Sequence, residues 1–249
     1  INKMVDVKKV KSIGDLDIEI FADGADLNGI LSLNKNPIIK GFTTNPTLMR
    51  ASGVTNYELF AKEVLKNIKD KSISFEVFAD DDKNIIKQAR KISSWQENVS
   101  VKIPIMNTGG SYSFKIIEEL SNDCISLNIT AIMTIKQVQM LLKVLNPDCN
   151  AIISIFAGRI ADTGIDPENT MLETRKLITN LPNTKLLWAS PREILNIYQA
   201  EKTKCDIITV PHSLLKKISN INKDLNQFSQ ETVQMFYNDA LKSGFNINT

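Results

Sequence analysis

Lys102 is the residue whose surroundings most strongly suggest covalent chemistry. It lies within Val99 to Gly110, where a short apolar run ends at Pro104 and a Thr-Gly-Gly turn follows, as expected of a buried strand. Desolvating an ammonium is costly, so a lysine in such a strand tends to lose its proton, and a neutral amine can form a Schiff base with a ketone or aldehyde. The alternative is a strand-edge lysine that reaches water or pairs with a carboxylate.

Polar residues of four other segments share the face on which Lys102 would lie if each segment is a strand. Successive side chains of a strand point to opposite faces, and these polar residues fall opposite to apolar neighbours. All of them lie at or near the C-terminal ends of their segments, where barrel enzymes carry their active sites. A solvent-facing antiparallel sheet would alternate too, but the helical stretches between the segments weigh against it. We therefore favour a functional amine, accompanied by Asp23, Glu76, Asn128, Thr130 and Ser154.

These groups match the needs of a Schiff-base aldol reaction. The amine condenses with a ketone, and the iminium accepts the electrons of the breaking carbon–carbon bond. One carboxylate must take a proton from the hydroxyl of the departing carbon, and a second acid–base group must help dehydrate the carbinolamine. Asp23 and Glu76 are candidates for these roles. Asn128, Thr130 and Ser154 could hold sugar hydroxyls or a catalytic water, although each residue type more often makes structural hydrogen bonds.

Two arginines and a serine suggest an anion site nearby. Arg159 follows the sixth apolar segment, and Ser190 and Arg192 follow the seventh, at the expected start of a helix. Two guanidinium groups near a helix N-terminus favour a phosphate. The alternative is that these are surface arginines paired with Asp162 or Glu193.

The elements that must position these residues repeat along the chain. Eight short apolar segments alternate with stretches of helical period, which predicts an α/β protein with a closed parallel (β/α)8 TIM barrel, or less favourably a doubly wound sheet. We expect one domain over 1–249, with the barrel at about 18–220. Helices are expected at 55–69, capped by Thr55, and at 82–95. The predicted strands are 18–23, 38–42, 73–78, 99–104, 124–129, 151–156, 185–189 and 206–210.

An additional C-terminal helix is expected at about 229–243. Its apolar residues recur at helical spacing and would form one face, which must pack on the barrel or on a neighbouring subunit. A homo-oligomer is therefore one expectation. The face comprises Val233, Phe236, Tyr237, Ala240 and Leu241.

Composition narrows the function classes. The 249 residues are 43% hydrophobic and 23% charged, and the net charge of +2 is spread along the chain, which favours small-molecule partners over nucleic acid or membrane. The first dozen residues, in which Met4 is a candidate start, lack the apolar core of a signal peptide, so we expect a cytoplasmic protein. Cys124, Cys149 and Cys205 have neither metal-ligand spacing nor an even count, which predicts reduced, buried cysteines.

Seven ordered blocks over about 18–211 resemble the transaldolase family: FADGADL, GFTTNPTL, SFEVFAD, VKIP, LNITAI, SIFAGRIADTG and LWASPRE. The resemblance implies a TIM barrel acting on sugar phosphates in the pentose phosphate pathway, without metal or organic cofactor. It implies that Lys102 is the Schiff-base lysine, Asp23 the acid–base aspartate, and Glu76 with Thr130 the pair that holds the catalytic water. By the same resemblance, Asn45 and Asn128 bind the dihydroxyacetone part, with Ser154 and Thr43 nearby, and Arg159, Ser190 and Arg192 bind phosphate.

Two subgroups of that family differ in what happens to the three-carbon unit. Transaldolases pass it to an aldose phosphate, whereas the smaller fructose-6-phosphate aldolases release it and tend to carry glutamine and tyrosine at the positions of Glu76 and Phe156. Both residues here resemble transaldolases. Ile155 stands where many members have proline, and the segment before residue 18 and the tail after 220 match no family block. A lyase, or a sugar-phosphate-binding barrel without turnover, is the alternative. His212, the only histidine, is interpreted as a helix-start or phosphate-neighbour residue.

Overall fold

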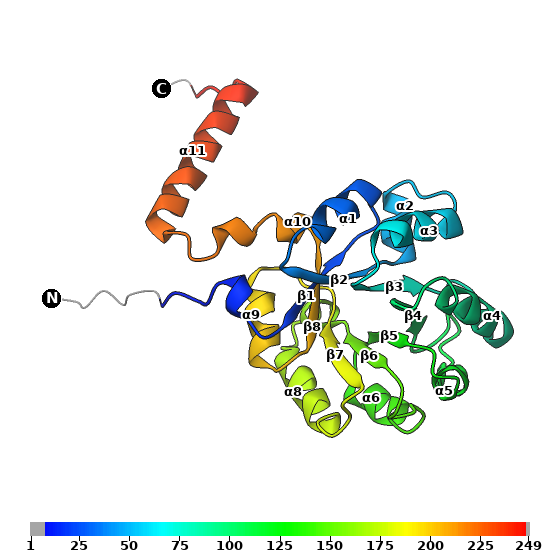
Figure 1. Ribbon diagram of the computed structural model, residues 1–249. Coiled ribbons are helices and arrows are strands. Elements are labelled where there is room, and N and C mark those ends of the chain that lie inside the picture. The colour runs from blue at the N-terminus through cyan, green and yellow to red at the C-terminus, as the bar shows by residue number, and fades with distance from the viewer. Residues whose placement is uncertain (1–7, 248–249) are drawn as a thin grey trace.

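The protein is a closed eight-stranded parallel barrel, described by a computed structural model over residues 8–247 (Figure 1). Each strand pairs with the next along the chain, and the last pairs with the first. The expected (β/α)8 fold is thereby confirmed, and seven strands begin within one residue of the predicted position. The strands are β1 Glu19–Asp23, β2 Ile39–Thr43, β3 Ser72–Glu76, β4 Val99–Pro104, β5 Leu127–Ile132, β6 Ala151–Ile155, β7 Thr184–Trp188 and β8 Ile207–Pro211.

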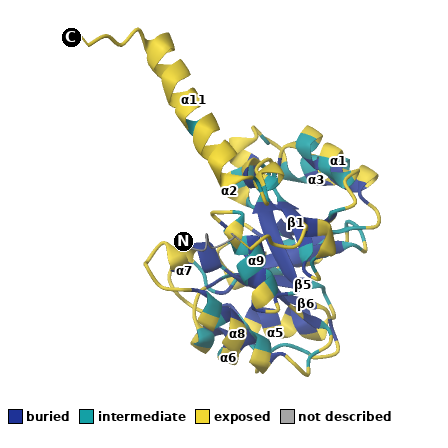
Figure 2. Ribbon diagram, turned by 90° about the vertical axis from the view of Figure 1, so that its left-hand side faces the viewer, coloured by how far each residue is buried: buried dark blue, intermediate teal, exposed yellow. Residues whose placement is uncertain are grey.

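Helices alternate with the strands and cover the outside of the barrel, so the strands are buried on both faces (Figures 1 and 2). The main core lies between the helices and the outward-facing strand residues, such as Phe75 and Val101. The helices are α1 Leu27–Asn34, α2 Pro46–Ala51, α3 Tyr57–Asn67, α4 Asp82–Ser93, α5 Phe114–Asn122, α6 Ile135–Leu141, α7 Ala157–Ala161, α8 Glu168–Leu177, α9 Leu195–Lys202, α10 His212–Leu215 and α11 Leu225–Ser243, with 3-10 turns η1 Ile13–Asp15 and η2 Ile218–Asn220.

Several boundaries differ from the predictions, among them the start of the C-terminal helix, which begins at Leu225, after its Asp224 cap, rather than at about 229. Two other differences have local backbone reasons. β5 begins at Leu127 rather than at 124, because Cys124 has a left-handed backbone (φ 54°) that ends the turn after α5. Helix α3 begins after Asn56 rather than Thr55, because the Asn56 side chain accepts the hydrogen bond from the Leu59 amide. Met4 lies outside the described residues.

The prediction that the three cysteines are reduced is wrong for Cys124 and Cys149, and Cys124 is also exposed, whereas Cys149 is buried as expected. Cys124 and Cys149 form a disulfide, with their Cα atoms 5.2 Å apart. Cys124 precedes β5 and Cys149 precedes β6, and the pairing of Leu127 with Ala151 brings the two strand starts together. Sequence spacing does not reveal this contact, because it depends on strand register. Only Cys205 is a free, buried thiol.

Reduction of this disulfide is expected to lower thermal stability. The bond closes a loop with a sequence separation of 25 residues. A cross-link of that length stabilises a fold by about 3 kcal/mol in the chain-entropy model, or about 6 to 12 °C in Tm for a chain of this size. Melting curves with and without reductant, together with the number of thiols alkylated before reduction, measure the effect. Three alkylated thiols before reduction, or equal melting temperatures, would contradict it.

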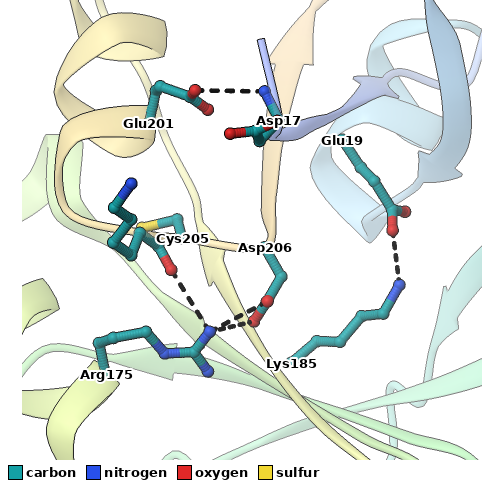
Figure 3. A pocket seen from close by; sticks show the side chains of 8 residues that line it. Asp17, Glu19, Arg175, Lys185, Glu201, Cys205 and Asp206 are labelled. Carbon is teal, nitrogen blue, oxygen red and sulfur yellow. Dashed lines mark hydrogen bonds and ion pairs between the residues drawn. The ribbon is translucent and has the colours of Figure 1, made fainter. Parts of the chain in front are cut away.

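Ion pairs and hydrogen bonds connect neighbouring elements at the N-terminal end of the barrel, around a cavity of about 310 Å³ (Figure 3). Arg175 of α8 contacts both oxygens of Asp206 at 3.0 and 3.1 Å, and Lys185 of β7 contacts Glu19 of β1 at 2.7 Å. Glu201 of α9 accepts hydrogen bonds from the backbone amides of Asp17 and Ile18. These contacts join β1, β7 and β8 at the face that serves barrel stability rather than catalysis.

Helix α11 stands away from the barrel, and its residues are almost all exposed (Figures 1 and 2). Its Asp224 cap and left-handed Gly244 mark a well-formed helix. Phe236 is 63% and Leu241 62% exposed, so the barrel does not cover the apolar face. None of the helices within residues 8–247 is both long and apolar enough to cross a membrane.

We predict that the α11 face packs on a second copy of the chain, because large contiguous apolar surface rarely stays exposed to water. The full chain should then be oligomeric at micromolar concentration. Replacing Phe236 and Leu241 with glutamate should shift it to the monomer without lowering the melting temperature of the barrel. Light scattering measures both states, and a monomeric wild type would contradict the prediction.

Candidate active site

A cavity of about 590 Å³ opens at the C-terminal ends of the strands. All twelve residues that the sequence proposed for the site line it, so the fold brings together side chains from β1 to β7 and from the loops that follow them. The cavity is also lined by residues that the sequence reasoning did not select, including Ala131, Leu187, Ala189 and Thr209. The proposed residues are Asp23, Thr43, Asn45, Glu76, Lys102, Asn128, Thr130, Ser154, Phe156, Arg159, Ser190 and Arg192.

Strand register places three of these side chains next to one another. Lys102 of β4 pairs with Glu76 of β3 on one side and with Asn128 of β5 on the other. Paired residues of neighbouring strands point to the same face, and these three point into the cavity. The alternation that the sequence suggested is thus the alternation between the barrel interior and the helical layer.

The Lys102 side chain is buried, with 6% of the residue exposed. Its Nζ donates a hydrogen bond to the Thr44 carbonyl at 2.9 Å and lies 3.4 Å from Oε2 of Glu76. Lys102 is therefore neither at a strand edge nor extended to water. This excludes the alternative of a lysine that reaches water, whereas the pairing with a carboxylate exists. The amine faces a cavity large enough for a small substrate.

Asp23 ends β1 and is held by a chain of hydroxyls. Thr43 donates to Oδ1 of Asp23 at 2.8 Å, and the Thr43 hydroxyl also shares a hydrogen bond with Thr209 of β8. Burial raises the pKa of the Asp23 carboxyl above its ordinary value, while the Lys102 charge, the Thr43 hydrogen bond and His212 oppose the rise. A carboxyl with a raised pKa can carry a proton between reacting groups near neutral pH.

Glu76 ends β3 beside the lysine. Burial raises the pKa of its carboxyl, the attraction to Lys102 lowers it, and the charge of Asp23 raises it further. Two carboxyls thus share one nearby lysine in a mostly buried site.

The Asn128 amide and the Thr130 hydroxyl lie on β5, the Ser154 hydroxyl lies on β6, and the Ser74 hydroxyl lies on β3. Ser154 donates to Oδ1 of Asn128 at 2.6 Å, and Nδ2 of Asn128 donates to the Ser74 hydroxyl at 3.0 Å. These bonds orient the Asn128 amide. The Thr130 hydroxyl is buried and has no hydrogen-bond partner among residues 8–247, although it lines the cavity. A buried hydroxyl without a partner favours a bound water or substrate oxygen there.

The mouth of the cavity is cationic on the side of β6 and β7. Arg159 lies in α7, and Arg192 follows β7 and pairs with Asp162. The pairing that the sequence left open as an alternative thus exists for Arg192, which still lines the cavity. Ser190 has a left-handed backbone (φ 61°), and its carbonyl oxygen would lie only 1.5 Å from a Cβ at position 158. Gly158 is therefore required for this arrangement, a role that the sequence reasoning missed.

Asn45 and Phe156 also stabilise the fold, Asn45 by capping a helix and Phe156 by packing inside the barrel. Oδ1 of Asn45 accepts the Leu48 amide at 2.9 Å and caps α2, which leaves its Nδ2 for a ligand. Phe156 packs on an apolar cluster inside the barrel that includes Phe21 and Leu187. Of this cluster, Phe156, Leu187 and Ala189 line the cavity and form an apolar part of the site.

The polar residues Ser74 and Thr209 were missed although a signal existed. Ser74 has the same parity as Glu76, and Thr209 falls opposite to Ile208 and Val210, so the period of two would have placed both inside the barrel. Ala131 gave no such signal, because it has a left-handed backbone (φ 62°) where the register of β5 against β6 shifts, and the period of two does not hold there.

His212 begins α10 as predicted and is not among the cavity-lining residues. Its ring packs against the backbone of Gly24 and Gly29, where a Cβ at position 24 would lie 2.6 Å from its Nε2 and one at position 29 would lie 2.9 Å from its Nδ1. Within residues 8–247, no group of three or more His, Cys, Asp or Glu side chains is arranged to hold a metal ion.

Comparisons with known proteins place the chain in a family. The profile of the family described as Transaldolase/Fructose-6-phosphate aldolase matches residues 20–248. A probable transaldolase of Dehalococcoides mccartyi is 31% identical over 202 residues, which cover 81% of this chain and 90% of the relative. A probable transaldolase of Thermoplasma volcanium is 32% identical over 202 residues, covering 80% and 86%.

Solved structures with lower sequence identity share the fold alone. Mandelate oxidase superposes with a TM-score of 0.53 at 10% identity, covering 82% of this chain and 71% of that protein. KGPDC of Streptococcus mutans has a TM-score of 0.52 at 9% identity, covering 79% and 88%.

Proposed function

The chain belongs to the transaldolase/fructose-6-phosphate aldolase family, and on that premise we propose that it transfers a dihydroxyacetone unit between sugar phosphates. The donor is a ketose phosphate such as fructose 6-phosphate or sedoheptulose 7-phosphate, and the acceptor is an aldose phosphate. This reaction would place the enzyme in the pentose phosphate pathway and in the cytoplasm. The single observation that carries the proposal is the buried Lys102 amine, which lies 3.4 Å from the Glu76 carboxyl in an open cavity that Asp23 also lines.

The proposed reaction begins with a Schiff base on Lys102. Nζ attacks the ketone carbon, and Glu76, with Thr130, holds the water that leaves the carbinolamine and later returns. Asp23 takes the proton from the C4 hydroxyl as the C3–C4 bond breaks, and its raised pKa suits this exchange. The electron pair of that bond passes into the iminium to give an enamine. The enamine then attacks the carbonyl of the acceptor, and Asp23 returns the proton.

Groups around the amine would hold the bound sugar. Asn45, Asn128 and Ser154 offer donors and acceptors to the hydroxyls of the three-carbon unit, and Thr43 keeps Asp23 in place. Arg159, Ser190 and Arg192 would bind the phosphate at the mouth. Because Arg192 is paired with Asp162, an incoming phosphate must compete with that carboxylate for the guanidinium.

Phe156 favours transfer over release of the three-carbon unit. A hydroxyl at this position could protonate the enamine, whereas a phenyl ring cannot, and Phe156 sits in an apolar cluster. The enamine should therefore wait for an aldose. The alternative is a lyase that releases dihydroxyacetone from fructose 6-phosphate, and a barrel that only binds sugar phosphates is the other candidate.

The experiment compares turnover of fructose 6-phosphate with and without an aldose phosphate such as erythrose 4-phosphate. Transfer should exceed release of free dihydroxyacetone by at least about tenfold. Release at a comparable rate without an acceptor would favour the lyase. The variant Phe156→Tyr should raise release relative to transfer.

A further inference from the structure

A tyrosine hydroxyl of helix α3 makes the last hydrogen bond at the C-terminal end of strand β3. Tyr57, the first residue of α3, donates a hydrogen bond to the Glu76 carbonyl at 2.6 Å. Glu76 is also the residue whose carboxyl lies beside Lys102. A side chain from outside the cavity thus holds the backbone of a residue inside it.

Strand β2 has no backbone amide that could donate this hydrogen bond to the Glu76 carbonyl. The Thr44 amide donates to the Ser74 carbonyl at 3.2 Å, which is the last rung between β2 and β3. In a parallel ladder the next donor lies two residues further along, at position 46, and its acceptor would be the carbonyl of Glu76. Position 46 is a proline, which has no amide hydrogen and starts α2. The Tyr57 hydroxyl takes the place of that missing donor.

The ring of Tyr57 is fixed by aromatic neighbours. Its centroid lies 5.3 Å from that of Phe78, 6.2 Å from that of Trp95 and 6.4 Å from that of Phe75. Phe75 and Phe78 flank the end of β3 in sequence. Burial raises the pKa of the Tyr57 hydroxyl, so the group stays protonated and remains a donor. The hydroxyl is therefore held rigidly against the strand end.

We propose that Tyr57 is a positioning residue for Glu76, which keeps the carboxyl at its contact with the Lys102 amine. This inference rests on the proposed function, because it assigns Tyr57 to the step that Glu76 serves. Without the hydroxyl, the hydrogen bonds on the β2 side of β3 among the described residues stop at the Ser74 carbonyl, and the Glu76 backbone is held only from the β4 side, where the Val77 amide donates to the Lys102 carbonyl at 3.0 Å. The Glu76 carboxyl then has more freedom to move from the lysine. A displacement of a reacting group by about 1 Å can lower a rate by about 10²-fold, so a smaller displacement should still lower it measurably.

The test is Tyr57→Phe, which removes one oxygen and keeps the ring. The matched control is Tyr198→Phe, because the Tyr198 hydroxyl also donates to a backbone carbonyl, that of Lys11 at 2.8 Å, and Tyr198 is not a cavity residue. We expect kcat for transfer to fall about tenfold in Tyr57→Phe, while KM for both sugar phosphates stays within about twofold. Tyr198→Phe should keep the kcat of the wild type.

The pH profile separates positioning from a general loss of stability. The charges that face Glu76 are those of Lys102 and Asp23, and Lys102 holds the Glu76 pKa down. Loosening that contact should move the acid limb of kcat to higher pH in Tyr57→Phe and not in Tyr198→Phe. Equal kcat and equal profiles for the two variants would overturn the inference alone. If the wild type forms no adduct at Lys102, the inference falls together with the proposed function.

Discussion

Replacing Lys102 with methionine is expected to lower kcat by about 10⁴-fold or more and to abolish covalent capture of the ketose. The reason is that no other group can form the iminium that accepts the electrons of the breaking bond. Methionine has nearly the length of lysine and suits a buried position, so the barrel should remain folded. Steady-state kinetics and intact mass after borohydride reduction measure the two effects.

Lys71→Met is the matched control for this variant. Nζ of Lys71 donates to the Asn34 carbonyl at 2.6 Å, much as Lys102 donates to that of Thr44, but Lys71 does not line the active-site cavity. Its kcat should stay within about twofold of the wild type. A Lys102→Met variant with a native melting temperature and substantial transfer activity would rule out the Schiff-base mechanism.

Replacing Asp23 with asparagine is expected to lower kcat for transfer by about 10² to 10⁴-fold, the range for loss of a general acid–base group. Cleavage of the C3–C4 bond needs a proton acceptor, and asparagine is not one. Capture of dihydroxyacetone by Lys102 should persist, because no carbon–carbon bond breaks in that reaction. Kinetics and borohydride trapping of the variant separate the two steps.

The pH dependence of kcat/KM in the wild type should also report Asp23. The Asp23 carboxyl must be ionised to accept the proton, and burial raises its pKa, so the acid limb of kcat/KM should lie above the ordinary titration range of aspartate. The limb assigned to Asp23 should vanish from the residual activity of Asp23→Asn. An unchanged profile would show that Asp23 is not the base.

Asp23 also makes a testable contribution to stability. Because its pKa is raised in the folded state, the unfolded chain binds fewer protons at this residue between the unfolded and folded pKa values. The contribution of Asp23 to the free energy of unfolding therefore increases as the pH falls through the folded pKa. The ionised carboxylate lowers the free energy of unfolding at neutral pH. Asp23→Asn should melt at an equal or higher temperature than the wild type at pH 7 while losing activity.

Strand periodicity predicted most of the site because the barrel obeys a simple rule. Alternation within each strand and the common C-terminal end of parallel strands were enough to place Asp23, Glu76, Lys102 and Asn128 around one cavity. The contact between Glu76 and Lys102 required the register of β3 against β4, which no single strand contains. Only the structure could therefore show which carboxyl pairs with Lys102.

Features that depend on backbone exceptions or on loop contacts could not be predicted. The left-handed backbones of Ala131 and Ser190 occur at residues that carry no glycine-like signal. The disulfide between Cys124 and Cys149 depends on which strand starts are neighbours. The Tyr57 hydroxyl replaces a rung that Pro46 removes, and it comes from a helix that sequence periodicity placed only on the outside.

The most direct measurement is borohydride reduction of the wild-type chain in the presence of fructose 6-phosphate, followed by intact mass and peptide mapping. We predict a reduced three-carbon adduct on Lys102 and none in Lys102→Met. A chain that forms no adduct with fructose 6-phosphate or dihydroxyacetone, or one modified only at other lysines, would contradict the proposal that Lys102 performs Schiff-base chemistry on these substrates.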